Sequence, residues 1–185
     1  MRLYYLLLII LLLGVATAVC AKQRSHIEVD DIESWLNDDV YMVRGDVTID
    51  LVNPILEALD NGVTLEFALY YDILRSNRWW LDKSIATISQ RYQVSYHALS
   101  RQYLLTNLNT RSVNTYYSLE LLLDDLGQIR DFPLIDKSLL EPDELYIVRM
   151  RAYLDYDELP IPLRIRAYSS ASWRPGSDWI LWPLR

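Results

Sequence analysis

Side chains able to act as a nucleophile or a base near neutral pH are scarce in this sequence of 185 residues. The imidazoles are His26 and His97, and the one thiol is Cys20. Nucleophilic catalysis needs a base beside an activated hydroxyl or thiol, and no Gly-x-Ser-x-Gly turn presents a serine for that purpose. Because an isolated histidine without a recognisable partner is weak support for catalysis, we predict no catalytic residue and a protein that is not an enzyme.

Acidic residues are plentiful, but they do not follow a metal-binding or hydrolytic pattern. Zinc sites need three or four closely spaced Cys, His or carboxylate ligands, and no such group includes either histidine. The acidic runs at 30–31 and 155–158 offer oxygen ligands, yet neither fits the Asp-x-Asp-x-Asp-Gly calcium loop. A glycosidase needs two carboxylates facing each other across a cleft, and the sequence singles out no such pair. We therefore expect no metal and no cofactor.

Aromatic side chains are the unusual feature of the composition, with fourteen tyrosines and six tryptophans. They combine an apolar ring with a polar tip and favour half-buried positions, so sheet packing accounts for most of them. Tryptophan, tyrosine and arginine are also the residues that dominate binding at protein interfaces. We predict an interaction surface formed by Arg78, Trp79, Trp80, Arg101, Trp173 and Trp179.

Apolar and polar residues alternate along much of the chain, which predicts strands. The clearest run is 63–73, and the same period recurs at 41–51, 92–96, 146–154 and 163–167. Arg149 with Arg151, and Arg164 with Arg166, would each place two side chains on one strand face. Turn signals occur at 44–46, 76–77, 107–110, 141–143 and 160–162, and the tail 169–185 is interpreted as a turn and a last strand.

Two short helices are predicted between the strands. Asn53 and Pro54 are typical of a helix start, with the asparagine as the capping side chain, and Asn61-Gly62 is typical of a helix end. The second helix covers about 118–126, with leucines on one stripe. Half-exposed strands at this spacing favour a mainly β fold: an antiparallel β-sandwich, immunoglobulin-like or similar, with the two helices as covers.

Residues 1–21 have the layout of a signal peptide, because Arg2 supplies a positive start and residues 3–19 contain no charge. The segment ends in two small-residue cleavage patterns, Ala16-Thr17-Ala18 and Val19-Cys20-Ala21, and cleavage after the second would start the mature chain at Lys22. An uncleaved membrane anchor and lipidation of Cys20 are the alternatives, since the apolar run is near the lower length limit for spanning a bilayer. In each case residues 22–185 form a single β-rich domain outside the cytoplasm, in the periplasm or anchored to the inner membrane.

The charge balance argues against a polyanionic partner. Residues 22–185 contain 17 basic and 25 acidic residues, a net charge of −8. Nucleic-acid-binding proteins normally show a basic stripe, whereas the Lys and Arg residues here are dispersed. We predict no nucleic-acid partner, and membrane contact only through the N-terminal segment if it is uncleaved.

The sequence contains YDILR at 71–75, RWW at 78–80, VSYHALSRQY at 94–103 and SDW at 177–179. These four segments resemble a family of exported proteobacterial proteins of unknown function. The resemblance covers nearly all of the chain after the N-terminal segment and implies an exported single domain. Genes of that family often lie beside one for a membrane sensor kinase of the nitrogen-regulation type, which implies a signalling link. The family has no established catalytic residues to carry over.

Three functional hypotheses follow. The first is a non-enzymatic interaction module of the cell envelope that contacts an envelope or membrane protein, with a sensor kinase as one candidate partner. The alternative is a carrier that holds a small molecule or lipid between two sheets, with tyrosine hydroxyls orienting the ligand. A filled core without a cavity would exclude the carrier. A hydrolase is the third hypothesis, and it would require a carboxylate pair in a cleft.

Overall fold

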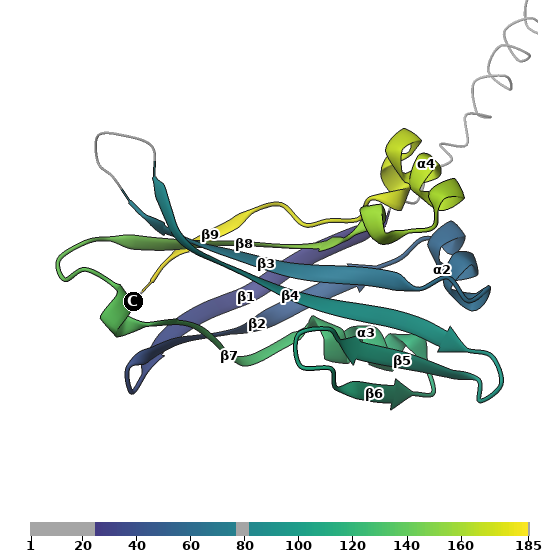
Figure 1. Ribbon diagram of the computed structural model, residues 1–185, viewed down its shortest axis with the longest axis horizontal. Helices are drawn as coiled ribbons and strands as arrows, with labels where there is room; N and C mark the ends of the chain where they lie inside the picture. The colour runs from purple at the N-terminus through teal and green to yellow at the C-terminus, as the bar shows by residue number, and fades with distance from the viewer. Residues whose placement is uncertain (1–24, 77–81, 185) are drawn as a thin grey trace, which may run out of the picture.

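Two antiparallel sheets lie face to face in a sandwich-like arrangement in the computed structural model, which describes residues 25–76 and 82–184 (Figure 1). The larger sheet has the strand order β6-β5-β4-β3-β8-β9 and the smaller one β1-β2-β7. The larger sheet consists of β3 (Leu65–Arg75), β4 (Lys83–His97), β5 (Gln102–Asn107), β6 (Val113–Tyr116), β8 (Tyr146–Leu154) and β9 (Ile180–Pro183). The smaller sheet consists of β1 (His26–Asn37), β2 (Val40–Asp50) and β7 (Gln128–Asp136). These sheets confirm the mainly β, sandwich-like prediction.

The core lies between the inner faces of the two sheets. Strand β8 alternates between buried and half-buried residues, as its sequence predicts. The central strand β3 differs, because most residues on both of its faces are buried. Its inner face carries large apolar side chains such as Phe67 and Tyr71, whereas its outer face buries Glu66 and Asp72 under neighbouring side chains. The expectation of half-exposed strands therefore fails at the strand that organises the larger sheet.

Helices α2 (Asn53–Asp60) and α3 (Leu119–Gly127) match the two predicted helices closely. Ser118 caps α3 by accepting a hydrogen bond from the backbone N–H of Leu121, and the helix packs against β2, β5, β6 and β7. The predicted cap of α2 is wrong, because its N-cap residue is Val52 and Asn53 is already helical. The hydroxyl of Ser25 instead accepts from the Val52 N–H at 3.1 Å. Gly62, with a φ of 84°, provides the predicted left-handed end.

Helix α4 (Ile161–Ser169) replaces the strand predicted at 163–167. Pro162 lies in its first turn, where a proline is tolerated, and the Arg164 guanidinium donates to the carbonyl of Leu159. Leu163 and Ala167 are four residues apart and so lie on the same side of the helix. Arg164 and Arg166 therefore do not share a strand face. The described part of the chain also contains three short 3₁₀ turns: η1 (Lys137–Leu139), η2 (Tyr156–Glu158) and η3 (Ala171–Trp173).

The turn predicted at 44–46 is also wrong, because β2 runs through it without a break. The hairpin turn follows β1 instead, at Asp38, which has a φ of 53°. Strand β1 bulges between Asp30 and Glu33, and the bulge lays the Ile32 side chain on Gly45, where a Cβ atom would collide with it. The glycine thus marks a close approach of two strands. The bulge also interrupts the period-two pattern of β1, which explains why this strand was not predicted.

Candidate functional site

An arginine–tryptophan cluster occupies the outer face of the larger sheet; it consists of Tyr70, Arg149, Arg151, Tyr153 and Trp179. The guanidinium carbons of Arg149 and Arg151 lie 4.8 and 5.0 Å from the centre of the Trp179 ring. The ring centres of Tyr70 and Trp179 lie 5.8 Å apart, with the two rings nearly perpendicular. The two arginines alternate with inward-facing residues of β8, so their predicted placement on one strand face is confirmed. Trp179 is 39% exposed and lies just before β9.

Only one of the two arginines is neutralised by an acidic neighbour. Arg149 donates from Nη2 and Nε to Oδ2 of Asp72, at 2.8 and 3.1 Å, and Asp72 is 2% exposed. The other oxygen of Asp72 accepts from the Ser84 hydroxyl at 2.5 Å. Among the described residues no carboxylate forms an ion pair with Arg151, and its Nε is buried without a hydrogen-bond partner. Within the described residues Arg151 therefore has no counter-charge.

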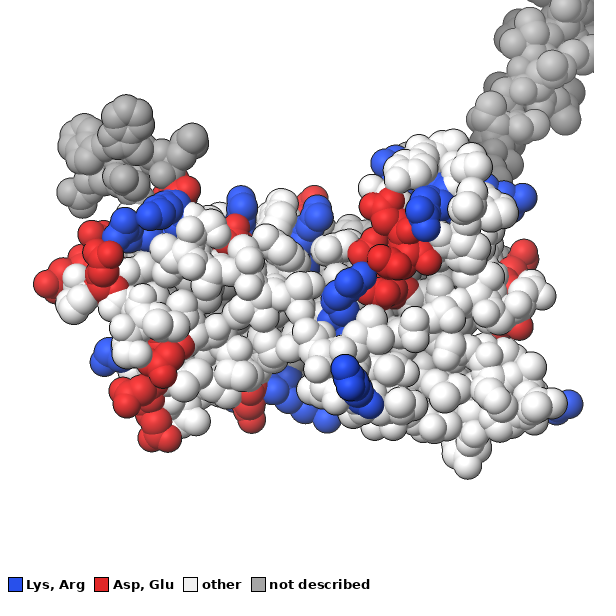
Figure 2. Space-filling view, in the orientation of Figure 1, with Lys and Arg blue, Asp and Glu red and all other residues white. Residues whose placement is uncertain are grey.

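A second charged group lies on the same face, towards α4. Arg91 on β4 contacts Glu66 through Nε, and its Nη2 lies 3.6 Å from Asp155 and 3.5 Å from Glu158. Burial raises the pKa of the Glu66 carboxyl, and the neighbouring Arg91 opposes that shift only in part. Figure 2 shows acidic side chains gathered beside α4. One arginine therefore forms ion pairs with three carboxylates, so acidic side chains outnumber basic ones in this group.

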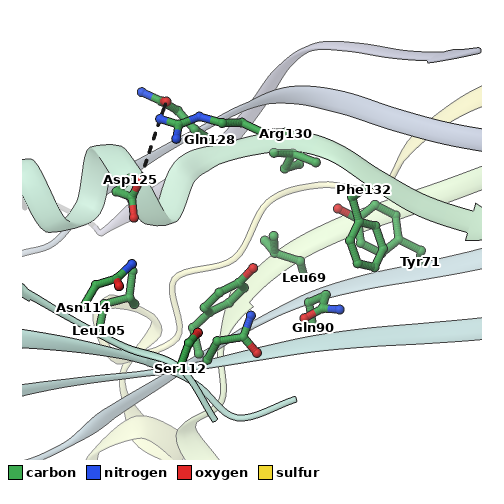
Figure 3. Close-up of a pocket in the computed structure, with 13 residues that line it drawn as sticks. Leu69, Tyr71, Gln90, Leu105, Ser112, Asn114, Asp125, Gln128, Arg130 and Phe132 are labelled. Carbon is green, nitrogen blue, oxygen red and sulfur yellow. Dashed lines mark hydrogen bonds and ion pairs between the residues drawn. The ribbon is translucent and has the colours of Figure 1, made fainter. Parts of the chain in front are cut away.

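A pocket of about 210 Å³ opens between the two sheets, on the side where α3 covers the core. Its walls include apolar and aromatic side chains from β3, β5 and β7, and its rim carries amide, hydroxyl and charged groups. The lining residues are Leu69, Tyr71, Gln90, Tyr92, Leu105, Asn107, Ser112, Asn114, Asp125, Gln128, Ile129, Arg130 and Phe132. In Figure 3 Tyr71, Phe132 and Gln90 lie towards one end, and Asp125 and Asn114 lie towards the other. A cavity between the sheets is therefore present, as the carrier hypothesis requires.

Two buried polar atoms in this pocket have no partner among the described residues: the hydroxyl of Tyr71 and Oε1 of Gln90. Tyr71 is fully buried, with its ring stacked on Phe132 at 5.3 Å. Burial raises the pKa of the Tyr71 hydroxyl, so the group stays neutral and keeps its proton. Two broader hollows, of about 800 and 530 Å³, are lined by none of the unpaired buried atoms.

The three predicted interaction residues that the structure describes do not lie in one patch. Trp179 joins the arginine–tryptophan cluster, whereas Trp173 is 5% exposed and packs in the core, so it has little surface to offer a partner. Arg101 is exposed in the turn between β4 and β5, with a φ of 53°. Arg78, Trp79 and Trp80 lie outside the described residues.

Sequence reasoning missed the roles of Arg151, Tyr71 and Gln90. The spacing of Arg149 and Arg151 was visible, but the stacking on Trp179 depends on β9 lying beside β8. Gln90 carried a signal that could have been read: it is the polar position between Ile88 and Tyr92 on a strand whose other inward residues are apolar or aromatic. A polar residue on a core-facing strand face often marks a functional position.

His26 and His97 lie apart from the pocket and from the cluster, and Cys20 lies outside the described residues. The Nδ1 atom of His97 is 3.0 Å from the Ser100 hydroxyl in an exposed turn, and no carboxylate in the described ranges contacts its other nitrogen. Within those ranges no group of three or more His, Cys, Asp or Glu residues is arranged to hold a metal ion. No helix in the described part of the chain is long and apolar enough to cross a membrane.

Comparison with known proteins gives one match. A family described as a domain of unknown function (DUF4390) matches residues 24–183, which is nearly all of the described chain. No curated protein and no solved structure matches the chain.

Proposed function

The chain belongs to the DUF4390 family, and we propose that its domain is a non-enzymatic interaction module of the cell envelope, which docks a partner protein on the arginine–tryptophan cluster. The observation that carries the proposal is the stacking of two guanidinium groups on one partly exposed indole. Tryptophan and arginine are the residues most enriched where interfaces gain their binding energy. Stacking also orients each guanidinium before a partner arrives, which lowers the entropy cost of binding.

The chemistry of the cluster defines the partner surface. Asp72 already neutralises Arg149, whereas Arg151 has no ion-pair partner among the described residues, so the partner supplies a carboxylate for Arg151. The exposed side chains of Trp179 and Leu181 provide adjacent apolar area. Among the described residues β9 is the last strand of its sheet, so an extended partner segment can also pair with its outer edge. We therefore propose an acidic, extended segment of the partner as the docking element.

The location and the partner class are part of the same proposal. The uncharged apolar run at 3–19 after Arg2 supports export, because it has the layout of a signal peptide or membrane anchor. The family resemblance supports a membrane sensor kinase as the partner. An envelope protein without a kinase domain would satisfy the docking chemistry equally well.

Site-specific crosslinking of the full-length protein, in the cells that make it, tests the docking face. A photoreactive residue at Leu181 should crosslink a distinct envelope protein, and one at Leu99, which is exposed at the β4–β5 turn, should not. Trp179→Ala and Arg151→Glu should each abolish the Leu181 crosslink. Arg101→Glu makes the same charge change at an exposed turn and should leave the crosslink intact. Equal crosslinking from both positions, or insensitivity to Arg151→Glu, would overturn the proposal.

A second candidate function, a small-molecule carrier, is favoured by the pocket between the sheets. Its volume of about 210 Å³ lies below the roughly 300–1,000 Å³ of most ligand sites, so a long lipid chain does not fit. A compact ligand does fit. The unpaired Tyr71 hydroxyl supports the role that we expect for tyrosines in a carrier.

A further inference from the structure

The pocket presents its two unpaired groups from neighbouring positions of one sheet face. In the β3–β4 register Gln90 lies opposite Leu69, and Tyr71 is two residues further along β3. Residues two apart on a strand point to the same side, so Tyr71 and Gln90 are diagonal neighbours on the inner face. Figure 3 shows both side chains at the same end of the pocket. A single bound group can therefore be recognised by the two residues together.

Leaving these two groups without partners disfavours the folded state. A buried polar group that loses its partners carries a desolvation cost that a hydrogen bond would remove. The hydroxyl of Tyr71 can donate or accept, and Oε1 of Gln90 can accept. A hydroxyl or amide group complements this pair, because each can both donate and accept a hydrogen bond.

The surroundings of the pair restrict the rest of the ligand. Leu69, Leu105, Ile129 and the Phe132 ring form apolar walls, which suit a hydrocarbon or aromatic body better than a sugar with many hydroxyls. No cationic side chain lies beside Tyr71 or Gln90 among the lining residues; Arg130 is exposed at the rim, where it contacts Gln128 and lies 3.7 Å from Asp125. An anion bound at the end of the pocket that contains Tyr71 and Gln90 would lack a counter-charge. A cavity of about 150 Å³ accepts a benzene ring, so this pocket has room for a substituted ring.

We propose that the pocket binds a small neutral molecule that has a ring-sized apolar body and one hydroxyl or amide group, which hydrogen-bonds to Tyr71 and Gln90. The site is independent of the docking surface, because Arg151 and Trp179 lie on the opposite face of the same sheet. Failure of one proposal therefore leaves the other in place.

Titration of the full-length protein with p-cresol, followed by ligand-observed NMR, tests this site. Toluene is the matched probe without a hydroxyl, and 4-methylbenzoate is the matched anion. We expect p-cresol to bind at least about fivefold more tightly than toluene, because two hydrogen bonds are added, and 4-methylbenzoate to bind more weakly than p-cresol. Tyr71→Phe and Gln90→Met should each weaken p-cresol binding by about two- to tenfold and leave toluene binding unchanged.

Tyr103→Phe is the control. The Tyr103 hydroxyl donates to Asp60 at 3.1 Å and does not line the pocket, so this variant should bind all three probes as the native protein does. Circular dichroism of each variant confirms that it is folded before titration. Three results would overturn the proposal: equal affinity for p-cresol and toluene, p-cresol binding that neither variant weakens, and no binding of any probe.

Discussion

Tyr71 and Asp72 are consecutive residues of β3, point to opposite faces of the sheet, and are both almost fully buried. On the outer face, Asp72 has partners for both oxygens, Arg149 on one and Ser84 on the other. On the inner face, the Tyr71 hydroxyl has no partner among the described residues. The same strand therefore carries a completed polar network on one side and an open one on the other.

The difference follows from charge. Burying an unpaired carboxylate costs far more than burying an unpaired neutral hydroxyl, so the chain must supply the partner of Asp72 itself. A neutral hydroxyl can stay buried without a protein partner at a smaller cost in free energy, which a bound ligand or water molecule would remove. The outer network is accordingly expected to determine stability, and the inner one to determine ligand binding.

Arg149→Met should produce the largest effect, because it leaves Asp72 buried without its counter-charge. We expect the free energy of unfolding to fall by about 3 kcal/mol, the lower end for breaking a buried pair, since the Arg149 side chain is partly open to solvent. Urea denaturation measures the change. Arg151→Met removes a guanidinium from the same indole without leaving a carboxylate unpaired. It should lower the free energy of unfolding by no more than about 1 kcal/mol. Equal losses in the two variants would contradict the comparison.

Removal of a tyrosine hydroxyl should have an intermediate effect on the free energy of unfolding, and the effect should depend on whether that hydroxyl has a hydrogen-bond partner. The Tyr116 hydroxyl donates to Asp125 at 2.5 Å, so Tyr116→Phe should lower the free energy of unfolding by about 1–2 kcal/mol. Tyr71→Phe removes a hydroxyl without a partner and should change stability by less than about 0.5 kcal/mol or raise it. Thermal and urea unfolding of both variants give the comparison. A loss in Tyr71→Phe as large as in Tyr116→Phe would show that the hydroxyl is already bonded.

The elements that could be predicted are those whose pattern is local and unambiguous. Strand β8 alternates over its whole length, and α3 has a capping serine and a leucine stripe. The prediction at α4 was wrong because Leu163 and Ala167 fit the spacing of a strand and of a helix equally well, and a short apolar run cannot be assigned by period alone. Its exposed residues Ile161, Ile165 and Tyr168 are also apolar or aromatic, so hydrophobicity does not mark the buried side.

The candidate sites could be predicted only in part, because they depend on strand order. Trp179 was expected at a binding surface, and Arg149 and Arg151 were expected on one face. That Asp72 meets Arg149 requires β3 to pair with β8, a contact between positions 77 residues apart. The polar position of Gln90 among the inward-facing residues of β4 is visible in the sequence, but its place in a pocket appears only when β4 pairs with β3 and the second sheet packs above them. Non-local pairing of this kind is not encoded in any single segment.

Glu66 extends the comparison between the two faces and should have a smaller effect on stability. It is a buried carboxylate on the same outer face as Asp72, but its negative charge is only partly balanced by a neighbouring arginine. Asp72 has Arg149, whereas Glu66 shares Arg91 with Asp155 and Glu158. Its pKa is raised in the folded protein, chiefly by burial, so the folded state binds a proton more tightly than the unfolded state. The contribution of Glu66 to stability is therefore fully present below its ordinary pKa of 4.5 and is lost as the pH rises through the raised value.

The test compares the unfolding free energy of the protein with that of Glu66→Gln across this pH range, because a glutamine does not titrate. The advantage of the native residue over glutamine should shrink as the pH rises from about 4 towards neutrality. Glu57→Gln makes the same charge change on the exposed side of α2 and is the matched control. A native advantage that grows with pH would mean that Arg91 outweighs burial, and that Glu66 is compensated as fully as Asp72.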